Sequence, residues 1–109
     1  MSNNYETLFD NLNSCIFKYN HGTSSRYHTG FIAQEVKDAM DIASISTQDF
    51  AALVIQQTEE GEKWGLRYEE FISLNTWQIQ KLKTRVTELE NEIALLKQNL
   101  QNPQNSDII

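Results

Sequence analysis

Apolar residues recur seven positions apart through the last third of the chain, and a leucine follows several of them by three. The resulting a/d series is Ile72, Ile79, Leu82, Val86, Leu89, Ile93, Leu96 and Leu100. This spacing is typical of a coiled-coil seam. An a/d stripe is too narrow to be buried within a monomer of this size, so the pattern predicts a parallel homo-oligomer formed by a long helix over residues 69–100.

The number of helices in the coil is indicated by two patterns that disagree. Ile or Val at a with Leu at d favours a dimer. Arg85 and Glu90, at g and e around the Val86 and Leu89 core pair, resemble a trimer signature in which the arginine forms an inter-helix ion pair with a neighbouring carboxylate. Both numbers stay open on these patterns, and we favour the trimer. Asn75, at the d position after Ile72, is the one polar residue at an a/d position; either it fixes the register, or the first heptad precedes the coil.

Before residue 69 the hydrophobic period changes repeatedly, as in a small mixed domain. Helical spacing predicts helices over 5–12 and 32–43, and alternation predicts strands over 15–19, 28–31, 51–57 and 63–68. Turn-forming residues at 20–25 and 59–62 would join the strands into two hairpins. The stretch 46–49 indicates either a brief helical turn or a loop.

These elements predict an α+β fold: a small head of short β-hairpins and helices, followed by a long C-terminal helix that forms a parallel trimeric coiled coil. The expected domains are a globular head over 1–68, a coiled-coil helix over 69–100 and a disordered tail over 101–109. Pro103 is the only proline of the chain and lies where the long helix should end.

Composition excludes several classes of function. The net charge of −6, with no cluster of Lys or Arg, argues against a nucleic-acid partner. No apolar run approaches the ~20 residues needed to span a bilayer, and the N-terminus does not resemble a signal peptide, so we expect no membrane association. Cys15, the single cysteine, cannot form an internal disulfide and is expected to be a small buried thiol.

Candidate catalytic and metal-binding residues are few. His21 and His28 have no Cys or carboxylate at a spacing that would complete a metal site. Glu59, Glu60 and Glu62 predict a solvated acidic hairpin tip. We therefore expect no catalytic, cofactor-binding or metal-binding residue, and the residue chemistry alone favours a binding or assembly module.

One block carries a more specific signal: Gly30, Phe31, Ile32, Ala33, Gln34, Glu35 and Val36. With the segments 17–19 before it, 66–72 after it and the coiled coil beyond, it resembles the endosialidase-type intramolecular chaperone domain. That family closes the C-terminus of bacteriophage tail spikes, tail fibres and neck appendages, and the resemblance runs from about residue 5 to residue 100. Gly30 would let the strand come close to the following helix, and Phe31, Ile32 and Val36 would supply core.

The resemblance implies a homotrimer that brings client β-rich fibre or spike chains into register, assists their folding and is then released by self-cleavage. It places the chain in the host cytoplasm during virion assembly and outside the mature fibre. It also supports the trimer over the dimer, since the parent fibres are trimers. Some relatives involve ATP in release, but no nucleotide motif occurs in this sequence, so no cofactor is expected.

The sequence departs from the family at the cleavage residues. Self-cleavage in the family uses a serine followed by a lysine five residues later. Here Ser2 is followed at that spacing by Thr7, and Ser14 has Lys18 four residues on. Either the cleavage site lies before Met1 or this protein lacks it, so no catalytic residue is carried over and no turnover activity is expected. The alternative function is a stand-alone oligomerisation, adaptor or fibre-assembly module with no proteolytic step.

Overall fold

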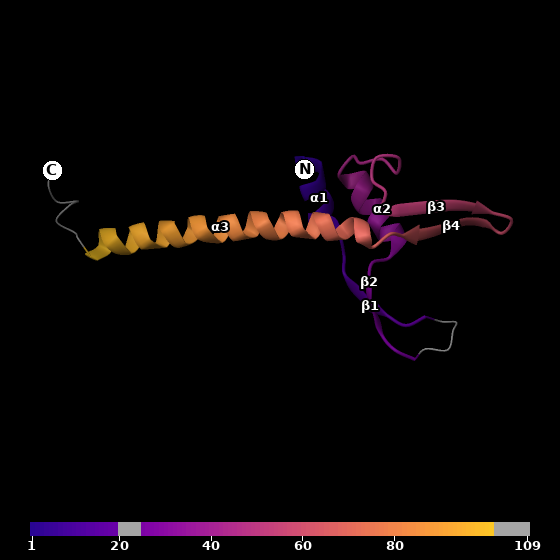
Figure 1. The fold of residues 1–109 in the computed structure, drawn as a ribbon, viewed down its shortest axis with the longest axis horizontal. Coiled ribbons are helices and arrows are strands. Elements are labelled where there is room, and N and C mark those ends of the chain that lie inside the picture. Colours follow the sequence, from indigo (N-terminus) through magenta and orange to yellow (C-terminus); the bar gives the residue numbers. More distant parts are fainter. Residues whose placement is uncertain (20–24, 102–109) are drawn as a thin grey trace. The chain divides into compact units, whose positions relative to one another are not determined.

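The computed structural model describes residues 1–19 and 25–101 as an α+β protein with two small antiparallel hairpins and a long C-terminal helix (Figure 1). The elements are α1 (Asn3–Asn11), β1 (Cys15–Phe17), β2 (His28–Gly30), α2 (Ala33–Ile42), β3 (Leu53–Thr58), β4 (Gly61–Leu66) and α3 (Glu69–Gln101). The predicted fold class is confirmed at this level. Pro103, His21, most of the turn at 20–25 and most of the predicted tail lie outside the described residues.

The chain divides into two compact units, Met1–Asn75 and Thr76–Ile109. The first, called the N-terminal unit below, contains both hairpins, α1, α2 and the first turns of α3. The division predicted from the sequence, with the head ending at residue 68, stays a prediction.

Each hairpin forms its own two-stranded sheet. In the first, Cys15 pairs with Gly30 and Phe17 with His28. In the second, the register runs from the Leu53–Leu66 pair to the Thr58–Gly61 pair at the tip. A two-stranded hairpin is only marginally stable alone, and β3 and β4 both contact α2, which in turn contacts α1.

The core of the N-terminal unit is formed by side chains of α1, α2, β3 and α3 and of the segment between α2 and β3. Its buried apolar residues are Leu8, Val36, Ala39, Met40, Ala43, Ile45, Phe50, Ala52, Leu53, Phe71 and Leu74. The apolar face predicted for the second helix supplies Val36, Ala39 and Met40, as its spacing required.

Two expectations about burial are wrong. Ile32 is 45% exposed because it is the N-cap of α2, with extended backbone (φ −95°, ψ 126°), and so does not follow the helical periodicity of the residues after it. Cys15 is half-buried rather than buried, as expected for a strand in a hairpin with one covered face.

Helix α2 ends in a Schellman motif, which was not predicted from the sequence. The N–H of Ile45 donates to the carbonyl of Met40 (2.9 Å), and the N–H of Ser44 donates to that of Asp41 (3.1 Å). This arrangement places Ser44 in the left-handed region with φ 58°. Ile45 and Met40 are both buried, which is the apolar contact that accompanies such motifs.

Ser44→Gly should stabilise the N-terminal unit. Removal of the Cβ relieves a left-handed conformation that costs an L-residue about 1–2 kcal/mol, and the greater freedom of glycine in the unfolded chain offsets part of this gain. We expect a net gain of about 0.5–1 kcal/mol in the free energy of unfolding, measured by urea denaturation. Ser46→Gly is the control. Ser46 has no positive φ and its Oγ donates to Asp49 (3.0 Å), so this variant should show no gain.

Candidate oligomerisation surface and the family motif

Helix α3 is a single helix of 33 residues, as the sequence predicted. It contains neither Gly nor Pro, and Glu69 and Glu70 in its first turn interact favourably with the partial positive charge of the helix N-terminus. None of the described helices is long and apolar enough to cross a membrane.

The predicted seam forms an exposed apolar stripe along α3. All eight of its members are exposed, from 40% for Leu89 to 81% for Leu100. They are eight of the nine large apolar side chains exposed on this helix, with Leu95 the ninth. The apolar surface of α3 is thus concentrated at a/d positions, the arrangement that a partner helix would cover.

The first turns of α3 present two different faces within the N-terminal unit. Phe71 and Leu74 are 2% and 1% exposed and belong to its core, whereas the neighbouring Ile72 and Asn75 are exposed. The residues that bury the helix against its own unit are therefore distinct from the a/d series. Both interpretations of Asn75 remain open.

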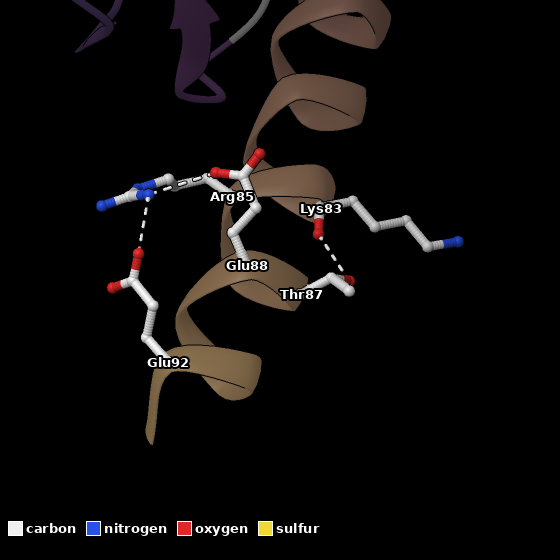
Figure 2. Close-up of polar contacts among 5 residues, drawn as sticks. All are labelled: Lys83, Arg85, Thr87, Glu88 and Glu92. Carbon is white, nitrogen blue, oxygen red and sulfur yellow. Dashed lines mark hydrogen bonds and ion pairs between the residues drawn. The ribbon is translucent and has the colours of Figure 1, made fainter. Parts of the chain in front are cut away.

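Arg85 has two carboxylate contacts on its own helix (Figure 2). Its Nη1 lies 3.1 Å from Glu88 Oε2 and 3.9 Å from Glu92 Oε1. All three side chains are more than half exposed, so each contact contributes little to stability. The inter-helix pair with Glu90 stays a prediction; these weak contacts within one chain would compete with it only slightly.

The family motif is completed by residues far away in the sequence. The Tyr68 hydroxyl accepts from the N–H of Phe31 (3.3 Å) and donates to its carbonyl (3.4 Å). The Phe31 ring is stacked with that of Tyr68, with centroids 6.2 Å apart, and lies 4.8 Å from the ring of Phe71. The segments 28–36 and 66–72, which together carried the resemblance, are therefore in direct contact.

Gly30 is required by this contact; the role suggested by the sequence, a close bend of the strand into the helix, stays a prediction. A Cβ at Gly30 would lie 2.5 Å from Tyr68 Oη and 3.1 Å from its Cζ. The Tyr68 ring cannot move away freely, because its stacking and both hydrogen bonds hold it against Phe31.

Gly30→Ala should destabilise the N-terminal unit by about 1–3 kcal/mol, the usual cost of overpacking. When Gly30→Ala is combined with Tyr68→Phe, the hydroxyl is removed. The nearest ring atom is then 3.1 Å from the alanine methyl group, which requires a shift of only a few tenths of an ångström. The double variant should thus be more stable than the two single effects predict, by about 0.5–1 kcal/mol in urea denaturation. Strict additivity would contradict the contact. Gly65→Ala is the matched control, since a Cβ there meets nothing within 4 Å.

Glu35 connects the motif to the segment after α1. Its Oε1 accepts from Asn13 Nδ2 at 3.3 Å, while its Oε2 is buried without a hydrogen-bond partner among the described residues. Other motif residues are ordinary parts of α2: Val36 is buried, and Gln34 is exposed.

Residues considered for chemistry are dispersed. His28 stacks on Phe17 (5.8 Å between centroids) and lies against the edge of Tyr19 (4.8 Å). Within residues 1–19 and 25–101, no group of three His, Cys, Asp or Glu could hold a metal ion. Lys18 Nζ lies over the Tyr27 ring at 4.4 Å, and Thr7 Oγ1 donates to the carbonyl of Asn3.

Comparison with known proteins gives one result. Residues 3–45 match the sequence model of a family described as chaperone of endosialidase. Searches of curated proteins and of solved structures found no match. The matched segment runs from the start of α1 through α2 to its Schellman motif and includes the whole block 30–36. The resemblance inferred from the sequence is therefore confirmed over residues 3–45, where the chain is similar to the chaperone of endosialidase family.

Proposed function

We propose that this chain is an intramolecular chaperone and trimerisation domain that assists the folding of a phage tail fibre or spike. The observation that carries the proposal is the family match over residues 3–45. The exposed a/d stripe of α3 supports it, because it supplies the surface through which copies of the chain would associate.

Such an assembly would address a difficulty of fibre folding. Intertwined β-fibres depend on contacts between distant residues and between chains, so their folding is slow and prone to misregister. Three chains joined at one end meet at an effective concentration of about millimolar. The trimer would therefore act while the client folds, in the cytoplasm of the host cell during virion assembly.

We carry over no catalytic residue for release. Lys18 is directed to the Tyr27 ring and Thr7 to a backbone carbonyl of its own helix, so neither is held as a base or nucleophile beside Ser14 or Ser2. Nor do we propose a role for ATP, because no nucleotide motif occurs in the sequence.

The first test is the mass of the purified chain in solution. Light scattering should give three times 12.6 kDa. A mass of one chain across the micromolar range would refute self-association, and a mass of two chains would refute the trimer alone.

The second test measures assistance to a client. The chain is placed at the C-terminus of a β-rich fibre segment, and the yield of soluble, trimeric fibre is compared with that of the segment alone. A raised yield supports the chaperone. If the chain forms trimers but leaves the yield of several fibre segments unchanged, the stand-alone adaptor without a proteolytic step becomes the better explanation. That alternative needs no Ser/Lys pair, and none with the family's spacing occurs within residues 1–45.

A further inference from the structure

The β3–β4 hairpin carries an open hollow of about 440 Å³ on one face. It is lined by two cross-strand pairs, Val54 with Gly65 and Gln56 with Lys63, and by Trp64, Leu66 and Arg67. Space is open beside Gly65, since a Cβ built there meets no atom within 4 Å. Lys63, Gly65 and Arg67 are separated by two positions each, so all three lie on the same face of the hairpin and the two cations flank the glycine; this site is called the notch below.

Lys63 and Arg67 are exposed and form no ion pair or side-chain hydrogen bond with any described residue. The backbone of Arg67 is fixed, because its N–H donates to the carbonyl of Ala52 (2.8 Å) and extends the ladder by one pair. The notch is therefore a cationic site on an ordered strand of a chain whose net charge is −6.

The tip of the same hairpin has the opposite charge. Glu59 and Glu60 form the turn and Glu62 follows it; all three are exposed. The backbone of the tip forms a tight turn, in which Gly61 adopts a φ of 113°. Thr58 Oγ1 donates to the Gly61 carbonyl at 2.6 Å and closes this turn. Figure 1 shows β3 and β4 extending from α2 to this tip.

The tip cannot occupy the notch of its own hairpin. Adjacent residues of a strand point to opposite faces, so Glu62 is directed away from Lys63. At ~3.3 Å per residue, Glu60 is about 23 Å from Arg67 along the strand. A tip carboxylate that reaches both cations must therefore come from another copy of the chain.

We propose that the acidic tip (Glu59, Glu60, Glu62) of one copy of this chain docks into the Lys63/Arg67 notch of a second copy. The two surfaces differ, so each subunit of a ring gives one tip and receives one, the head-to-tail contact that a closed cyclic assembly permits. The contact rests on the proposed self-association. Exposed ion pairs are individually weak, and only the effective concentration of about millimolar within an assembly would populate them.

Cysteine cross-linking tests the contact. In a Cys15→Ser background, chains with Gln56→Cys at the notch are mixed with chains of a different tag that carry Glu60→Cys at the tip. Oxidation of the assembled mixture should give a covalent heterodimer. Gln57→Cys replaces Gln56→Cys in the matched control, because Gln57 points to the opposite face of the hairpin. We expect about tenfold more cross-linked product from Gln56→Cys than from this control.

Charge exchange provides the second readout. Lys63→Glu with Arg67→Glu should lower the cross-linked yield to the control level, and Glu59→Lys with Glu62→Lys on the partner chain should restore it. Raised salt should lower the yield of the unchanged pair, because exposed ion pairs are screened.

The outcomes separate the two proposals. An oligomer by light scattering whose Gln56→Cys yield equals that of Gln57→Cys refutes the docking and leaves self-association standing. A monomer refutes self-association, and the docking with it. If cross-linking is absent but Lys63→Glu with Arg67→Glu abolishes assistance to a fibre, the notch binds an acidic client segment and the contact between copies is refuted.

Discussion

Val86→Asp together with Leu89→Asp is expected to convert the assembly to monomers. Each chain would place two carboxylates in the seam, where they lose water and gain no partner, at a cost of several kcal/mol per buried charge. Light scattering should show the mass of one chain at concentrations at which the parent is oligomeric. Both side chains are already about half exposed in the single chain. The variant should therefore keep its helix and N-terminal unit folded, and its far-UV circular dichroism spectrum should match that of the parent.

The matched control adds the same charge to the same helical turns outside the seam. Thr84→Asp with Thr87→Asp occupies positions f and b, which face solvent in a coiled coil, so the oligomer should persist. An unchanged mass for Val86→Asp with Leu89→Asp would mean that the N-terminal units hold the subunits together. Dissociation by both pairs would show that net charge alone controls assembly.

Phe71→Ala is expected to unfold the N-terminal unit. Phe71 is 2% exposed, and its ring contacts those of Phe31 (4.8 Å), Phe50 (5.8 Å) and Tyr68 (6.3 Å between centroids). Truncation of such a side chain costs about 3–5 kcal/mol, a large share of the stability of a domain this small. The fluorescence of Trp64, half-buried on β4, and hydrogen exchange in α2 should report the loss.

Ile72→Ala is the control in the same helical turn. Ile72 is 65% exposed, so the unit should unfold at nearly the same urea concentration as the parent. Equal destabilisation by the two variants would contradict the assignment of Phe71 to the core and Ile72 to the a/d stripe.

The regular elements were predictable because their hydrophobic periods are simple. The heptads of α3, the helical face of α2 and the alternation around Val54 and Trp64 each required only local sequence. The two hairpins followed from strand and turn residues, although β1 is shorter than predicted, ending at Phe17.

Three features were not predicted, and one of them depends on a residue far away in the sequence. Ile32 was expected in the core because it continues the helical period, yet as the N-cap it has strand-like dihedrals. The reason for Gly30 is a tyrosine 38 positions later in the chain, which local patterning cannot locate. The left-handed Ser44 escaped prediction because glycine is the usual residue at that position.

The contact of Phe31 with Tyr68 and Phe71 sets a practical limit on how this domain can be transferred. A fragment that ends at residue 45 would contain the whole matched family segment but would lack Phe50, Leu53, Phe71 and Leu74 of the core. Such a fragment should be soluble only as an unfolded chain. A fusion designed to transfer the fold must extend at least through Leu74, beyond the boundary that sequence similarity marks.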